Sequence, residues 1–251
     1  MQIENQLVKV TQFNYNTIFD TVEAYPSVGA ADTLMLTIFN NTSTNQSIFF
    51  EHTNSAKEVN PKSFAKVAVW KMPGKRTVPF YSANKTQKYL GLSSAIIFNN
   101  SNEKAFFWNL REYDESINQQ YFEGANLNFS NYIPDVFTIN SKVHTIYKAN
   151  QMAMVLGNVG DSIYIDILNS GLMYHSVHFH GYHVKIIESN KSNEMIGWDK
   201  DSFPIDPGEL ISVLLVPHQP GLYPVHDHNL KAVTIGGNYP GGMIAMLKIE
   251  P

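Results

Sequence analysis

Two short histidine-rich runs carry the chemistry that this sequence can perform. The first run, residues 175–181, contains His178 and His180, and the second contains His226 and His228. Because residues i and i+2 of a β-strand point to the same face, each run presents two imidazoles in one direction. Histidine is the commonest metal ligand, and nitrogen-rich sites suit copper, zinc, iron or nickel better than oxygen-preferring cations. The spacing therefore predicts a transition-metal site.

A single histidine in a strand is more often structural than functional. We interpret His52, His144 and His218 in this way, because each stands alone in its segment. Two His-x-His pairs within one domain are a different pattern, and they favour metal binding over a structural role.

Length and composition limit what can hold such a site. The chain has 251 residues, 12% aromatic and 16% charged, which is typical of a β-rich globular protein with one large or two smaller domains. A net charge of -4 gives no basic surface for nucleic acid. No stretch approaches the roughly 18 apolar residues of a membrane span, and the first residues have no apolar signal core.

Cysteine is absent, which excludes disulfides, thiolate metal ligands and iron–sulfur clusters. Asn-x-Ser/Thr acceptor sites for glycosylation are frequent and begin at Asn40, Asn41, Asn45, Asn84, Asn99, Asn128 and Asn190. They support an extracytoplasmic location, whether secreted, periplasmic or pseudoperiplasmic.

Short runs of β-branched and aromatic residues, separated by Asn, Ser, Gly and Pro, predict strands along the whole chain. In the first half they are residues 33–39, 47–50, 65–70, 94–98 and 105–110, and in the second half residues 136–139, 162–167, 184–187, 210–216 and 243–249. A polar connection with a short helix around 114–122 separates the two series. We therefore predict an all-β protein of two sandwich domains, residues 1–120 without a metal motif and residues 121–251 with the histidine-rich site.

Four motifs in the second half of the chain follow one another in an order that is also found in a known protein family. They are the His-x-x-His-x-His-Gly run, Phe-Pro-Ile-Asp-Pro-Gly-Glu at 203–209, Pro-Gly-Leu-Tyr-Pro-Val-His-Asp-His at 220–228, and Gly-Gly-Met at 241–243. Together they resemble the last cupredoxin domain of multicopper oxidases, in the manner of ceruloplasmin-like and two-domain oxidases and copper nitrite reductases. In the first half, residues 89–97 and 107–116 resemble the end of a cupredoxin domain and the crossing to the next. The resemblance implies two cupredoxin-like Greek-key sandwiches.

The resemblance also assigns roles to the histidines. It makes His178 a type 2 copper ligand and His180, His226 and His228 type 3 ligands, and it makes His175 a type 1 ligand. Strand geometry agrees with this division, because position 175 is an odd number of residues from 178 and falls on the other face. His183 lies one position after the place where family members often carry a histidine, so we expect it to bind no metal.

The departures from the family concern the type 1 centre. Asp227 stands where the family has the type 1 Cys, and no histidine follows between 228 and 243. A blue copper site without thiolate is not available, so the electron-entry centre is expected to be absent. Asp227 becomes the candidate catalytic residue by tuning the neighbouring histidines. Its alternative role is a structural hydrogen bond to His175.

The first domain lacks the His-x-His motifs that two-domain oxidases contribute from a neighbouring chain. Only His52, next to Glu51, lies where such a motif would stand. Two-domain members close into rings of three, so the resemblance implies a homotrimer with the site between chains.

Three functions remain open. The first is a copper-dependent oxidoreductase, an enzyme of multicopper oxidase or nitrite reductase type, that acts on O2, superoxide, nitrite or another nitrogen oxide with electrons from an external donor. The others are a copper-binding or storage protein without turnover, and a structural cupredoxin protein. Copper is the expected cofactor, and four imidazoles also accept zinc.

Overall fold

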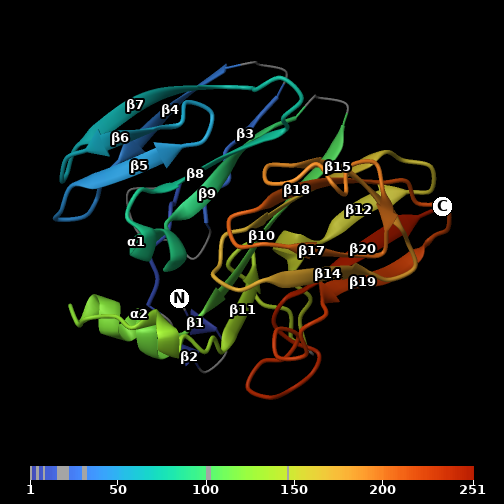
Figure 1. Cartoon of the computed structure of the whole chain (residues 1–251). Helices are drawn as coiled ribbons and strands as arrows, with labels where there is room; N and C mark the ends of the chain where they lie inside the picture. The colour runs from blue at the N-terminus through green and yellow to red at the C-terminus, as the bar shows by residue number, and fades with distance from the viewer. Residues whose placement is uncertain are drawn as a thin grey trace. The chain divides into compact units, whose positions relative to one another are not determined.

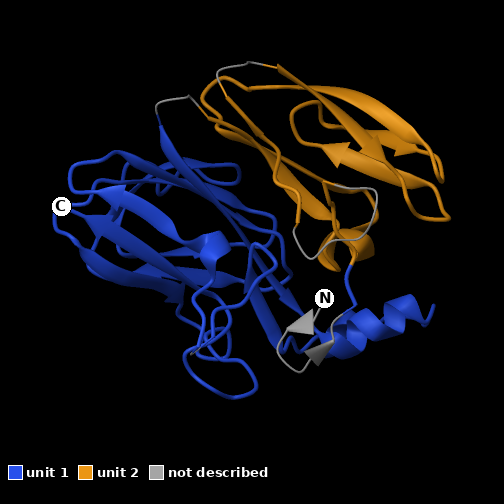
Figure 2. Cartoon of the chain, turned by 180° about the vertical axis from the view of Figure 1, so that it is seen from behind, with its two compact units in different colours: residues 1–10, 103–251 blue, residues 11–102 orange. Residues whose placement is uncertain are grey.

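The chain divides into two compact units, residues 11–102 and residues 1–10 with 103–251, coloured separately in Figure 2. In this computed structural model the described residues are 2–3, 6–7, 9–15, 23–29, 33–99, 103–145 and 147–251. Each unit is built mainly of strands, and the all-β prediction is confirmed.

The larger unit is a sandwich of two sheets (Figure 1). The six-stranded sheet has the order β11 (Val136–Ile139), β10 (Lys104–Tyr113), β13 (Ile163–Asn169), β18 (Leu210–Leu215), β15 (Val184–Ser189) and β16 (Asp199–Lys200). The five-stranded sheet has the order β12 (Val155–Asn158), β20 (Ile244–Glu250), β19 (Gly221–Asp227), β14 (His175–Phe179) and β17 (Ser202–Ile205).

The core of this unit lies between the two sheets and follows from the two-residue period of the strands. In β13 the side chains of Ile163, Ile165 and Ile167 all point into the core and are fully buried. Burial stabilises each such side chain by about 1.5–3 kcal/mol. The indole Nε1 of buried Trp108 donates to the carbonyl oxygen of Ala153 at 2.9 Å, so its polar atom is satisfied.

The division between the units lies earlier than the predicted boundary after residue 120. Strand β10 runs parallel to β13, with Cα partners from Lys104 with Ile163 to Leu110 with Asn169. This pairing joins β10 to the six-stranded sheet, so the unit that carries the histidines begins at residue 103. Parallel pairing of distant strands leaves no local sequence signal, which is why the expected boundary followed the polar connection instead.

The predicted helix is α2 (Glu115–Phe122). It begins at Asp114, whose carboxylate accepts a hydrogen bond from the backbone N–H of Ile117 at 3.0 Å, and Glu115 in the first turn favours the positive end of the helix dipole. The unit also contains β1 (Gln2–Ile3), β2 (Gln6–Leu7), η1 (Phe129–Asn131) and η2 (Gln151–Ala153). Within the described residues, no helix is long and apolar enough to cross a membrane.

The smaller unit has its own sheets and its own core. The five-stranded sheet has the order β3 (Ser27–Val28), β9 (Ser93–Phe98), β8 (Thr77–Ser82), β5 (Gln46–Phe50) and β6 (Ser55–Val59), and a second sheet pairs β4 (Thr33–Phe39) with β7 (Phe64–Trp70). A short helix, α1 (Lys85–Tyr89), follows β8. Ile48, Phe50, Phe80 and Ile96 fill the core, so two independent sandwiches are present, as predicted.

Candidate metal centre

The two histidine runs lie side by side on neighbouring strands of the five-stranded sheet. Strands β14 and β19 are antiparallel, and His178 is the direct cross-strand partner of His226. Beyond the strand ends, the backbone N–H of His180 donates to Pro224 at 3.1 Å, and that of His228 donates to Ser176 at 2.9 Å. The four predicted ligands therefore lie on one face, which points away from the core.

The four imidazoles form one cluster. The ring centroids of His178 lie 4.7 Å from His180, 4.9 Å from His228 and 5.5 Å from His226. Those of His226 lie 5.0 Å from His180 and 6.0 Å from His228. The Nε2 atoms of His180 and His226 are 2.9 Å apart. The convergence that the spacing predicted is present in the fold.

Hydrogen bonds orient two of these rings. The Nδ1 of His226 lies 2.8 Å from the carbonyl oxygen of Asp227. Because a carbonyl only accepts, Nδ1 carries the proton and Nε2 keeps its lone pair for the cluster. The Nδ1 of His178 lies 2.7 Å from the hydroxyl of Ser202, which leaves its Nε2 free.

The protonation of the cluster suits metal binding. Burial lowers the pKa of His178 below its usual 6.5, and the charges of His228 and His226 lower it further. Burial also lowers the pKa of His180, followed by the charges of His178, His226 and His228. Neutral imidazole is the form that binds a metal, so near neutral pH these rings need lose no proton.

The donor set fits an imidazole-preferring metal such as copper. With metal–nitrogen bonds of about 2.0–2.1 Å, two ligands of a tetrahedral ion stand about 3.3 Å apart, close to the 2.9 Å between His180 and His226. Over the described ranges, no group of three or more ligating side chains is already arranged around a common metal position. Small rotations of the exposed imidazole rings would be needed to bring three or more of them around one metal ion.

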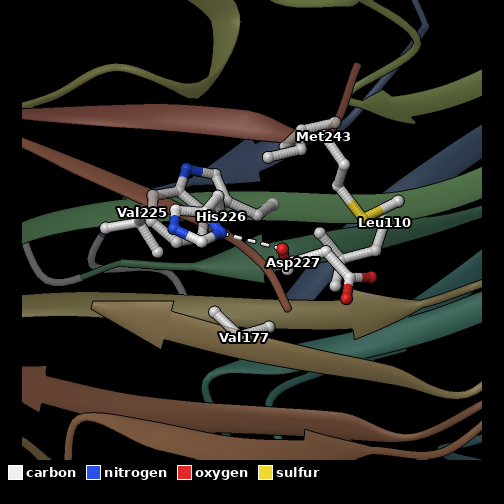
Figure 3. A pocket seen from close by; sticks show the side chains of 8 residues that line it. Leu110, Val177, Val225, His226, Asp227 and Met243 are labelled. Atoms are coloured by element: carbon white, nitrogen blue, oxygen red, sulfur yellow. Dashed lines mark hydrogen bonds between the residues drawn. The ribbon is translucent and has the colours of Figure 1, made fainter. Parts of the chain in front are cut away.

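The core behind the cluster is closely packed. A cavity of about 10 Å³ lies beneath His226 and Asp227, and its lining includes Val177, Val225 and Met243 (Figure 3). This volume is at the lower limit for holding one water molecule. Strands β14 and β19 therefore rest on a closely packed layer, which limits their movement.

Behind the core face of these strands lies a chain of three charged side chains, His175 of β14, Asp227 of β19 and Glu112 of β10. The Nδ1 of His175 bonds to the carboxylate of Asp227, and its Nε2 lies 3.0 Å from Oε2 of Glu112. All three side chains are buried, with 1% of His175 and none of Glu112 exposed. The hydrogen bond that we predicted between Asp227 and His175 is confirmed.

The two carboxylates change the protonation of His175. Burial alone lowers the pKa of His175, but the hydrogen bonds to Asp227 and Glu112, and then their charges, raise it to about 9. Both ring nitrogens thus carry protons and have carboxylate partners, which leaves no lone pair for a metal. The resemblance implied His175 as a type 1 ligand, and we do not carry it into the proposed ligand set.

Glu112 is the residue of this charged chain that sequence reasoning did not single out. It lies in β10. This strand pairs with β11 on one side and with β13 on the other. Glu112 follows the strand-like run 107–110 within the same strand, and a buried Glu is rare unless paired. The unusual position of this carboxylate was the signal in the sequence that could have identified Glu112.

The remaining histidines lie outside the cluster. His183 and His218 are exposed on the surface of the larger unit. The backbone of His144 pairs with Gly242. In the smaller unit, His52 is 8% exposed, its Nε2 lies 3.1 Å from the carbonyl oxygen of Ala68, and its ring packs edge-on against Trp70. A ring held in this way is poorly placed to serve as a ligand for a neighbouring chain.

The fold of the chain is similar to that of solved copper proteins of cupredoxin type. It superposes on a blue copper oxidase from Nitrosomonas europaea with a TM-score of 0.72 and 18% identity, over 90% of this chain and 75% of that chain. The multicopper oxidase mgLAC gives 0.71 and 19%, over 90% and 76%. A copper nitrite reductase from Nitrosomonas europaea gives 0.65 and 13%, over 91% and 83%. Comparison with curated proteins gives no match.

The fold is of cupredoxin type, and its larger unit carries an imidazole cluster. Residues 113–236 match the multicopper oxidase family, and this range includes all four clustered histidines. The chain resembles a degenerate member of this family that lacks a type 1 copper site, because it contains no cysteine.

Proposed function

We propose that the protein binds copper through His178, His180, His226 and His228. The observation that carries the proposal is the approach of the Nε2 atoms of His180 and His226 to 2.9 Å, from strands far apart in the sequence. The lowered pKa values of His178 and His180 support the same ligand set. So does the hydrogen bond at Nδ1 of His226, because it leaves the lone pair on Nε2 of that ring. We favour copper over zinc, because the family match concerns copper proteins.

We further propose a copper-dependent oxidoreductase that acts on a small molecule such as O2, nitrite or another nitrogen oxide. Bound copper would supply redox chemistry and Lewis acidity at one place. His180 and His228 are exposed, so a small substrate has access to the cluster. Asp227 enters this proposal as a positioning residue, because its carboxylate faces the core and its carbonyl oxygen holds His226.

The source of electrons separates this function from its alternative. On the core face, where the resemblance implies a type 1 centre, Glu112, His175 and Asp227 form a buried charged chain. The oxidoreductase therefore needs an external electron donor. The same observation favours a second function, copper binding or storage without turnover, because the usual entry for electrons is missing.

Steady-state assays distinguish the two functions. Copper-loaded protein is given excess reductant together with O2 or nitrite, and consumption of each is followed against metal-free protein and a His180→Ala, His228→Ala double variant. Multiple turnovers per copper in the loaded protein alone support the oxidoreductase. Tight copper binding without turnover supports storage, and absence of copper binding refutes both.

Two further proposals concern assembly and location. We propose a homotrimer, from the family resemblance, but without His52 as a shared ligand because of its contacts with Ala68 and Trp70. A single species of three chains by light scattering supports it, and a monomer contradicts it. We also propose an extracytoplasmic location, which glycan or fractionation analysis of the native protein tests.

A further inference from the structure

The geometry points to Glu112 as a positioning residue for the imidazole cluster, acting through His175 and Asp227. Glu112 lies in β10 of the six-stranded sheet, whereas His175 and Asp227 belong to the five-stranded sheet. The chain of contacts therefore links the ligand strands to the opposite layer of the sandwich. The inference rests on the proposed copper site, and it adds a residue that does not touch the metal.

Glu112 is itself held by a pocket that fits its carboxylate. Its Oε1 accepts hydrogen bonds from the backbone N–H groups of Leu172 at 2.6 Å and Met173 at 2.7 Å, and from the hydroxyl of Tyr132 at 3.3 Å. A Cβ atom at Gly171 would overlap the carboxylate, so the glycine makes room for it. These contacts fix Oε1 and direct Oε2 toward His175.

His175 contacts both Glu112 and Asp227, so the fixed position of Glu112 also fixes that of Asp227. Each of its ring nitrogens faces a carboxylate, so both must donate, and the ring cannot turn without breaking one bond. Hydrogen bonds between charged partners are roughly twice as strong as neutral ones. The imidazole therefore acts as a rigid spacer between Glu112 and Asp227.

Asp227 connects the His175 ring to the two proposed ligands on either side of it, His226 and His228. Its side chain bonds to His175, and its Oδ1 accepts from the backbone N–H of Asn229 at 2.7 Å, just after His228. Its carbonyl oxygen accepts the Nδ1 proton of His226 at 2.8 Å. Moving Asp227 would thus turn the His226 ring and shift the backbone on which His228 sits.

A purely structural role for Glu112 would stabilise the fold and leave the ligands unchanged. The two roles differ in copper affinity, because polar partners behind metal ligands typically change affinity 10- to 100-fold when they are replaced. They also differ in the ring signals of His226 in the absence of metal. Both are measurable in folded protein, independently of any loss of stability.

The test is Glu112→Gln, with Glu209→Gln as the matched control. Glu209 is also buried in the larger unit, and its carboxylate accepts from Ser189 Oγ at 2.7 Å and from the N–H of Asp206 at 2.9 Å, away from the cluster. Titration of the full-length protein with Cu(II) against a competing chelator should show unchanged stoichiometry and a Kd raised about tenfold or more for Glu112→Gln only. An unchanged Kd, or equal changes in both variants, overturns the inference.

A double-mutant comparison tests whether Glu112 acts through His175. In a His175→Ala background, Glu112→Gln should have no further effect on the Kd. An equal effect in both backgrounds overturns the proposed path. If Glu112→Gln does not fold, Glu112→Asp keeps the charge but shortens the side chain, and it should raise the Kd in the same direction.

A measurement without metal separates this inference from the proposed function. The ¹H–¹⁵N ring signals of His226 should shift in metal-free Glu112→Gln and stay in place in Glu209→Gln. Should the unmodified protein bind no copper, the proposed function fails, while a shift confined to Glu112→Gln still supports positioning. Unshifted His226 signals in Glu112→Gln refute positioning even if copper binds.

Discussion

The imidazoles of His180 and His226 meet at 2.9 Å between their Nε2 atoms, although 46 residues separate them in the chain. His180 follows the end of β14 and His226 lies near the end of β19, so the pairing of these strands creates the contact. In metal-free protein, one nitrogen donates a proton to the other. A bound metal would take the place of this hydrogen bond, with the neutral His180 ring keeping its one proton on Nδ1, which makes the contact a natural starting point for metal entry.

Replacing one of the clustered histidines should remove copper. We expect His180→Ala and His228→Ala each to lower the copper stoichiometry measured by elemental analysis, because the cluster has no spare imidazole. His183→Ala is the control and should retain full copper, since His183 is exposed outside the cluster. Equal losses in all three variants would contradict the proposed ligand set.

Copper-loaded protein should lack the intense blue absorption of a copper–thiolate bond, because the chain has no cysteine. Its electron paramagnetic resonance spectrum should show a type 2-like signal with wide hyperfine splitting, as expected for imidazole ligands alone. Visible absorption and resonance spectra of the same sample check both. A strong blue colour would disprove our interpretation of the core face.

His175→Ala should retain copper stoichiometry but lose stability. The substitution leaves the buried carboxylates of Glu112 and Asp227 without their shared partner, and breaking a buried ion pair costs about 3–5 kcal/mol. Denaturant unfolding of metal-free protein measures the loss. A change below 1 kcal/mol would show that the two carboxylates are not held by His175.

The stability of metal-free protein should fall between pH 6.5 and 9. The pKa of His175 is raised to about 9 from 6.5, so its contribution is complete below pH 6.5 and is lost as pH rises through 9. The shift corresponds to about 3 kcal/mol. Unfolding curves across this range should slope downward for the native sequence and be nearly flat for His175→Ala. The lowered pKa values of His178 and His180 act below pH 6.5, outside this window.

Gly171→Ala should destabilise the larger unit by about 1–3 kcal/mol, because the new Cβ would overlap the Glu112 carboxylate. Gly29→Ala is the control, since no atom of the described residues lies within 4 Å of where its Cβ would be. Thermal unfolding of both variants provides the comparison. A neutral Gly171→Ala would mean that Glu112 can move aside without loss.

The sequence by itself determined which imidazoles cluster together. The types and spacing of His178, His180, His226 and His228 predicted one cluster on one face, and the odd offset of His175 placed it on the other. These inferences needed only the two-residue period of a strand, which is local. The absence of cysteine excluded a thiolate centre regardless of fold.

Only the tertiary structure decided what occupies the core face. Glu112 is 63 residues from His175, and it reaches the ring because β10 pairs in parallel with β13 and faces the other sheet across the core. The same pairing moved the unit boundary to residue 103. Which distant strands pair depends on the packing of the whole sandwich, and no local pattern encodes it. The sequence therefore contained the proposed ligands, whereas the charged chain behind them emerged from the fold.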